Sequence, residues 1–195
     1  MPILVITTGG TIGAMPYKDT KHPPKVTPMP AKGQDFVRLA LQKIPNIKTR
    51  CVSLEQRDSK EIDDVYWQEI LNTIKQAPET SVMITYGTDT IIAAAEALHK
   101  QQQLDNVFKN KTLLLTGAMV ALSCGAESDG LPNMRFALQR LNEGQMQTGV
   151  YIVLSDYADE DAKAGWQPRM YKFAPGQYTK IYDPEDARRN RIKRK

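Results

Sequence analysis

The 195-residue chain has few of the residues that build disulfide-rich or metal-held folds. Its two cysteines, Cys51 and Cys124, lie far apart in sequence, which excludes a disulfide framework and makes a reducing cytoplasm the expected compartment. With only two histidines, His22 and His99, the chain shows no paired ligand spacing, so we expect no metal. No apolar run approaches the roughly 18 residues of a membrane span, so no membrane partner is expected. The short run at residues 3–6 lacks a basic leader, and no signal peptide is expected.

Charge of one sign is concentrated at the C-terminus. The net charge is +4, but residues 188–195 hold six basic residues and no acid, which leaves 20 basic and 22 acidic residues elsewhere. We therefore expect residues 183–195 to form a disordered basic tail. A tail that binds nucleic acid or a membrane surface is an alternative. No aromatic residue follows Tyr182 to stack on bases, which argues against nucleic acid as a partner.

The apolar residues form short runs that alternate with segments of helical spacing. The runs predict buried strands at residues 3–7, 47–52, 82–86, 112–116 and 150–154, and the spacing predicts helices near 36–44, 65–74, 91–98 and 134–141. Such alternation is typical of a parallel sheet with helices on both faces. We predict a three-layer, doubly wound, mainly parallel α/β fold of the flavodoxin or Rossmann type, as a single domain over residues 1–182.

Three of the predicted strands end in polar segments. These are residues 7–11, 86–90 and 116–118. Because ligands of such sheets bind beyond the carboxyl ends of the strands, we expect the three segments to face one crevice. Residues 15–33 contain five prolines and predict a long loop, which is either a lid or disordered.

Taken singly, each polar segment has an ordinary structural interpretation. A simple turn from a strand into a loop explains Gly9 and Gly10. Their spacing to Gly13 does not match the phosphate-binding G-x-G-x-x-G pattern. Residues 88–90 and Asp129 precede predicted helices, where Thr and Asp are favoured N-caps. Individually, the turn and the caps are the favoured interpretations.

Taken together, these segments resemble a known family. Residues 7–13, TTGGTIG, resemble the signature T-G-G-T-I of the bacterial-type L-asparaginases, and residues 87–90, GTDT, resemble their H-G-T-D-T, with Tyr86 in place of the usual His. Residues 115–119, LTGAM, and residues 129–133, DGLPN, are weaker matches in the same order. Over roughly residues 1 to 175 the chain is similar to the N-terminal domain of the asparaginase/glutaminase family.

The resemblance implies hydrolysis of L-asparagine or a similar small amide through a threonine nucleophile and an acyl-enzyme. Thr11 matches the nucleophile, whose weak hydroxyl needs an activating group. Thr88 and Asp89 match two members of a Thr-Lys-Asp relay, and Asp89 would also accept hydrogen bonds from the α-ammonium of the substrate. No cofactor and no metal are implied.

The lysine of this relay is implied at Lys163. Its alternative is a solvated lysine in an acidic loop, and Arg169 or Lys172 could take its place. The lid tyrosine that shields the nucleophile in the family is assigned to Tyr17, the only tyrosine of the loop, because the nearest spacing holds Pro24 and Lys25. An ordinary loop aromatic is the alternative for Tyr17.

The implied substrate-binding residues also follow the motifs. Gly10, Gly87 and Ala118 lie at strand ends, and Ser59 matches the serine that grips the α-carboxylate. Lys60 stands where the family usually has Gln or Ser. It could pair with a carboxylate or be a surface lysine.

The family resemblance also bears on assembly. Full members carry a C-terminal domain that completes the pocket of a partner subunit, and this sequence ends near the start of that domain. We therefore expect a homodimer or higher homo-oligomer that acts on a small-molecule substrate. The alternative is a catalytically weak or inactive homologue that serves as an amino-acid-binding module.

Overall fold

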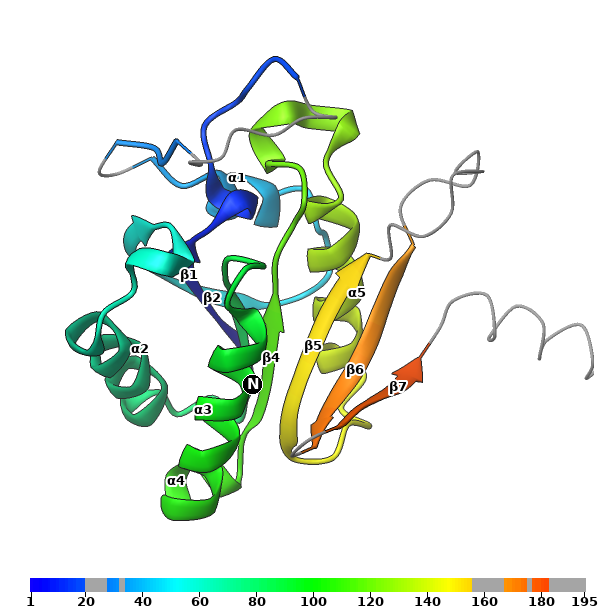
Figure 1. The fold of residues 1–195 in the computed structure, drawn as a ribbon. Coiled ribbons are helices and arrows are strands. Elements are labelled where there is room, and N and C mark those ends of the chain that lie inside the picture. The colour runs from blue at the N-terminus through cyan, green and yellow to red at the C-terminus, as the bar shows by residue number, and fades with distance from the viewer. Residues whose placement is uncertain (20–27, 32–33, 156–166, 175–176, 183–195) are drawn as a thin grey trace, which may run out of the picture.

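A seven-stranded sheet with the order β2-β1-β3-β4-β5-β6-β7 forms the middle of the protein (Figure 1). The computed structural model describes residues 1–19, 28–31, 34–155, 167–174 and 177–182. The strands are β1 (Ile3–Gly9), β2 (Thr49–Arg57), β3 (Ser81–Thr85), β4 (Thr112–Thr116), β5 (Gly149–Ser155), β6 (Pro168–Ala174) and β7 (Gln177–Tyr182). Strands β1 to β5 pair in parallel, and β6 and β7 pair antiparallel.

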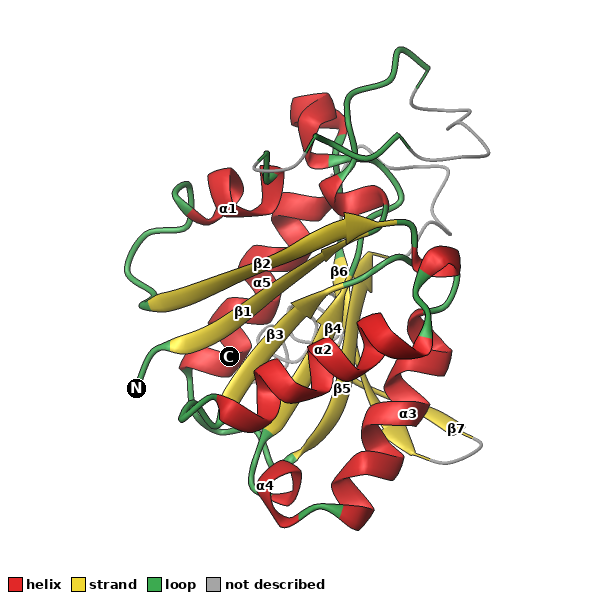
Figure 2. Ribbon diagram, turned by 90° about the vertical axis from the view of Figure 1, so that its left-hand side faces the viewer, coloured by secondary structure: helices red, strands yellow, loops and turns green. Residues whose placement is uncertain are grey.

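Helices cover both faces of the sheet, as Figure 2 shows. One face carries α2 (Asp64–Gln76), α3 (Ile91–Leu104) and the short α4 (Asn106–Lys109), and the other carries α1 (Phe36–Leu41) and α5 (Gly130–Asn142). Short 3₁₀ turns follow three strands, at η1 (Thr11–Gly13), η2 (Ser59–Glu61) and η3 (Leu122–Glu127). The predicted three-layer, mainly parallel α/β architecture is confirmed.

Strand β1 shows why the apolar runs are continuous. Leu4 and Ile6 pack against α2 and α3, whereas Ile3 and Val5 pack against α1 and α5. All four are at most 3% exposed. Since successive side chains point to opposite faces of a sheet, a strand covered by helices on both sides must be apolar at every position.

The edges of the sheet depart from the sequence prediction. Strand β2 begins at Thr49 rather than 47, runs on to Arg57, and is half-buried or exposed along its length, because it is an edge strand. The prediction of a buried strand is therefore wrong there. Strands β6 and β7 were not predicted, since Arg169 and Lys172 interrupt the apolar pattern of β6 and leave only Met170 and Phe173 buried.

Strand register brings the ends of β1, β3 and β4 to one level. Thr7 pairs with Thr85, and Thr85 pairs with Thr116. All three threonines are fully buried. The chain segments that follow them therefore emerge side by side at one edge of the sheet.

One sequence-based expectation concerns residues outside this fold, and another concerns its helices. The predicted tail, residues 183–195, lies outside the described residues, so the division into a 1–182 domain and a tail stays a prediction. Among the helices that the structure describes, none has the length and apolar character needed to cross a membrane.

Candidate active site

The absence of side chains at glycine positions allows the three strand ends to contact one another. A Cβ atom built on Gly10 would lie 2.4 Å from the Cα of Gly87, and one built on Gly117 would lie 2.7 Å from the carbonyl oxygen of Tyr86 and 3.0 Å from Cγ2 of Thr88. Any larger residue would separate these segments. We call residues 9–11, 86–90 and 116–118, together with Ser59 and Lys60, the strand-end site.

Gly10 has a second reason to be glycine. Its φ of 71° and ψ of −178° fall in a region that residues with a Cβ essentially never occupy. The backbone N–H of Gly10 donates to the carbonyl of Arg57 over 2.8 Å. This bond ties the turn after β1 to the end of β2.

Thr11 opens the 3₁₀ turn η1 and is half-buried. The next residue, Ile12, is fully buried in the α1/α5 core, where its Cγ1 would lie 3.1 Å from a Cβ built on Gly130. Backbone bonds from Gly13 N–H to Gly10 O and from Ala14 N–H to Thr11 O close the turn. The burial of Ile12 therefore anchors the turn and fixes the position of the Thr11 backbone.

Ser59 comes from η2, beyond the end of β2, and lies against Gly87. It is 6% exposed, and a Cβ on Gly87 would come within 2.5 Å of its Oγ. The Thr90 hydroxyl donates to the Ser59 carbonyl over 3.3 Å. Three predicted residues, Gly10, Gly87 and Ser59, thus lie together, while Ala118 is fully buried at the end of β4.

Lys60 and Asp89 form an ion pair at the surface of the site. The Lys60 Nζ lies 2.6 Å from Asp89 Oδ2, and the two side chains are 62% and 56% exposed. The hydrogen bond to Asp89 raises the pKa of Lys60. The sequence left open whether Lys60 pairs with a carboxylate or is a plain surface lysine, and in the structure its partner is Asp89.

The N-cap interpretation of two motifs is right in position but wrong about the side-chain hydrogen bond. Thr90 and Asp129 hold the N-cap positions of α3 and α5, yet neither side chain makes a capping hydrogen bond. The Thr90 hydroxyl is directed to Ser59. Asp129 instead accepts hydrogen bonds from the loop after β4, so both side chains bond to other segments of the chain.

Asp129 holds the loop after β4. It is fully buried and accepts from the N–H groups of Met119, at 3.0 Å, and Val120, at 2.9 Å. Asn133 donates to Gly117 O over 2.9 Å and to Asp129 over 3.2 Å. Burial raises the pKa of Asp129, and the backbone hydrogen bonds oppose that shift. The D-G-x-x-N motif thus fixes the end of β4.

We expect Asp129→Asn to destabilise the protein by about 1–3 kcal/mol, because an amide NH₂ replaces an oxygen that accepts from buried donors. Urea unfolding of the two proteins measures the difference. Asp63→Asn is the matched control: Asp63 is exposed and caps α2 by accepting from Tyr66 N–H over 2.8 Å. Asn caps helices as well as Asp. Equal stabilities of Asp129→Asn and the parent would contradict this role.

Tyr17, the predicted lid residue, contacts the same loop after β4. Its hydroxyl accepts from Ala121 N–H over 3.3 Å and lies 3.4 Å from the carbonyl oxygen of Met119. The Ser123 hydroxyl donates to Ala14 O over 2.8 Å. The first part of the proline-rich loop is therefore docked on residues 119–123.

The relay lysine is the least defined member of the site. Lys163 lies outside the described residues. Of its alternatives, Arg169 pairs with Leu154 near the carboxyl end of β5, whereas Lys172 pairs with Tyr151 near the opposite end. The Lys172 ammonium lies 3.3 Å from Gln147 Oε1, which places it away from the strand-end site.

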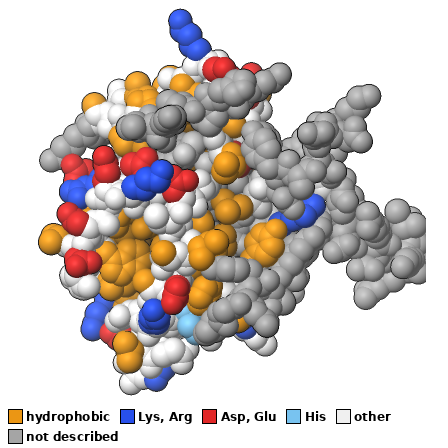
Figure 3. Space-filling view, in the orientation of Figure 1, with side chains coloured by type: hydrophobic (Ala, Val, Ile, Leu, Met, Phe, Trp, Pro, Cys, Tyr) orange, Lys and Arg blue, Asp and Glu red, His pale blue; other side chains and the backbone are white. Residues whose placement is uncertain are grey.

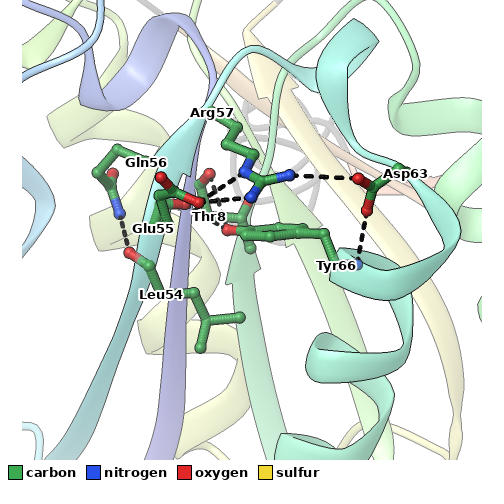
Figure 4. Close-up of polar contacts among 7 residues, drawn as sticks. All are labelled: Thr8, Leu54, Glu55, Gln56, Arg57, Asp63 and Tyr66. Atoms are coloured by element: carbon green, nitrogen blue, oxygen red, sulfur yellow. Dashed lines mark hydrogen bonds and ion pairs between the residues drawn. The ribbon is translucent and has the colours of Figure 1, made fainter.

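The sequence motifs did not indicate a group of polar contacts that Tyr66 makes at the ends of β1 and β2. The buried hydroxyl of Tyr66 on α2 lies 2.5 Å from Glu55 O and 3.2 Å from Thr8 O, and the Arg57 guanidinium lies 4.8 Å from the centre of the Tyr66 ring (Figure 4). Burial raises the pKa of Tyr66. Tyr66 thereby joins α2 to the ends of β1 and β2. A tyrosine in a first helical turn carries no sequence signal for this role.

Within the described part of the chain, no group of three or more His, Cys, Asp and Glu side chains is arranged to hold a metal ion. The cysteines Cys51 and Cys124 are both free thiols. Burial raises the pKa of the Cys51 thiol, which lowers its nucleophilicity at neutral pH. The candidate reactive groups that the motifs indicate are the hydroxyl, carboxylate and ammonium groups of the strand-end site.

Comparison with protein families identifies one match that covers most of the chain. A family model described as asparaginase, N-terminal, matches residues 2–169. No curated protein sequence matches this chain significantly.

Two solved structures share the fold. The thermostable L-asparaginase from Thermococcus kodakarensis is 20% identical, with a TM-score of 0.57 over 94% of this chain and 57% of that chain. The probable cytoplasmic L-asparaginase from Campylobacter jejuni is 19% identical, with a TM-score of 0.59 over 93% of this chain and 58% of that chain. This chain thus spans somewhat more than half the length of either structure.

Proposed function

This chain belongs to the asparaginase family, and from that premise we propose that it is an amidohydrolase that cleaves the side-chain amide of L-asparagine or a similar small amide. The observation that carries the proposal is the contact between the two signature segments: Gly10, next to Thr11, lies against Gly87, next to Thr88. The motifs thus meet at the carboxyl ends of adjacent parallel strands, where α/β sheets bind ligands.

In the proposed reaction Thr11 is the nucleophile. Its Oγ1 attacks the amide carbon, and its proton passes to a relay of Thr88, Lys163 and Asp89. The C–N bond then breaks, and ammonia leaves with that proton. Water attacks the resulting ester, which releases the acid and restores the Thr11 hydroxyl. Backbone N–H groups at the strand ends would stabilise the oxyanion by about 3 kcal/mol per donor.

The remaining site residues are proposed to bind and cover the substrate. The Ser59 hydroxyl is assigned to the α-carboxylate, and the backbone of Gly10, Gly87 and Ala118 shapes the floor. Asp89 is assigned to the α-ammonium because the family resemblance gives it that role and its carboxylate is 56% exposed. Tyr17 is proposed as part of the lid, through its contact with the loop after β4.

Ammonia release from L-asparagine, L-glutamine and simple amides tests the proposal. We expect turnover of at least one of these substrates by the purified protein. The alternative, an amino-acid-binding module, predicts a calorimetric response to L-aspartate or L-asparagine without ammonia release. Absence of both turnover and binding would contradict both functions.

We further propose a cytoplasmic homodimer or higher homo-oligomer. The two cysteines are free thiols, as a reducing compartment favours. Light scattering on the eluted peak of a sizing column measures the assembly. A monomer at micromolar concentration would contradict the oligomer.

A further inference from the structure

The charge of the Asp89 carboxylate is already compensated within the chain. The ammonium of Lys60 lies 2.6 Å from Asp89 Oδ2, and Lys60 directly follows Ser59, whose Oγ lies against Gly87. The carboxylate proposed to receive a ligand cation therefore already has a cation of the protein beside it.

This pair is open to solvent and is one of several at the surface. In the orientation of Figure 1, Lys and Arg side chains alternate with Asp and Glu along the left-hand part of the face (Figure 3). The Lys60 and Asp89 side chains are 62% and 56% exposed, and an exposed ion pair contributes little to stability. The pair therefore affects the charge of the site more than it affects the fold.

An ammonium group and a carboxylate group of a ligand would interact with the Lys60–Asp89 pair in different ways. An α-ammonium that binds Asp89 either displaces Lys60 from Oδ2 or uses the other carboxylate oxygen, and it then lies close to a like charge. A carboxylate meets a cation on a long, flexible side chain that can turn toward it. A neutral Gln at position 60 would leave Asp89 uncompensated, which would attract an ammonium and repel an anion.

We propose that Lys60 is a specificity-determining residue that adapts the site to amides carrying a carboxylate but no α-ammonium, such as the monoamides of short dicarboxylic acids. This inference rests on the proposed function, since it assumes the same pocket and the same nucleophile. In this assignment Lys60 and Ser59 bind the carboxylate together. For such substrates Asp89 has no α-ammonium to bind, and it orients Lys60 beside the site.

The test compares succinamate with L-asparagine as substrates of the full chain and of Lys60→Gln. We expect the ratio of kcat/KM for succinamate to that for L-asparagine to fall about tenfold in Lys60→Gln, as expected for the loss of one unit charge a few ångströms from the ligand in a high dielectric. Lys60→Arg keeps the charge and should keep the ratio. A ratio unchanged in Lys60→Gln would overturn the proposal.

Lys100→Gln is the matched control. Lys100 pairs with Glu96 at 2.9 Å on α3, and these side chains are 70% and 54% exposed. The variant removes the same charge and a similar ion pair elsewhere on the surface. Its substrate ratio should equal that of the parent, and a tenfold fall there would overturn the assignment to Lys60.

Calorimetry with succinate and L-aspartate separates this inference from the proposed function. If no amide is hydrolysed, the amidohydrolase proposal fails, but Lys60→Gln should still shift binding preference from succinate toward L-aspartate by about tenfold. An unshifted preference, or no binding of either compound to the parent protein, would overturn the role of Lys60.

Discussion

Replacing Thr11 by alanine is expected to lower ammonia release by about 10³-fold or more, because the variant lacks the hydroxyl that forms the acyl-enzyme. Thr11 is half-buried at the start of η1, and the turn is held by backbone bonds and by buried Ile12. The fold should therefore tolerate the change. Initial rates with a saturating amide substrate measure the effect.

Thr11→Ser is the control for this variant. It keeps a hydroxyl at the same position and should retain much more activity than Thr11→Ala. Circular dichroism and the thermal midpoint of both variants should match the parent. Equal ammonia release by Thr11→Ala and the parent would show that Thr11 is not the nucleophile.

The second large effect is expected at Gly10. An alanine there must adopt a conformation that is essentially restricted to glycine, with φ 71° and ψ −178°, and its Cβ would lie 2.4 Å from the Cα of Gly87. Backbone atoms cannot move aside as the end of a side chain can. We expect Gly10→Ala to destabilise the protein by about 3 kcal/mol or more, from backbone strain plus overpacking.

Gly144→Ala is a comparison variant that measures the cost of a positive φ without a collision. Gly144 has a similar φ of 67°, but a Cβ built there would meet nothing within 4 Å. We expect it to cost only about 1–2 kcal/mol. Urea unfolding of both variants measures the difference. If both lost the same stability, the contact between Gly10 and Gly87 would not constrain the site.

Much of the fold could be predicted because helices on both faces leave a simple pattern in the sequence. Strand β1 is apolar at each position from Ile3 to Ile6, since its neighbouring residues enter two different cores. The edges could not be predicted in this way. Strand β2 was predicted with the wrong bounds and as buried, whereas it is half-exposed, and β6 was missed because Arg169 and Lys172 interrupt its apolar pattern.

The candidate site was predictable in its composition but not in its contacts. The motifs pointed to Thr11, Thr88 and Asp89 by resemblance, and their roles stay predictions. The sequence alone favoured capping by Thr90 and Asp129, and neither side chain caps its helix. A capping bond is local, whereas the partners that these side chains have in the structure come from other segments of the chain.

By itself, the sequence determined the alternation of strands and helices from β1 to β5 and the polar residues that follow β1, β3 and β4, because periodicity and strand-end glycines are local properties of the chain. Only the tertiary structure decided that Gly10 touches Gly87, that Asp129 holds the loop after β4, and that Lys60 pairs with Asp89. Each of these contacts joins segments that the sheet brings together, and its geometry depends on the path of the whole chain between them. Cysteine and histidine are scarce in this chain, and the contacts that position the strand-end site in the structure are packing, hydrogen bonds and an ion pair.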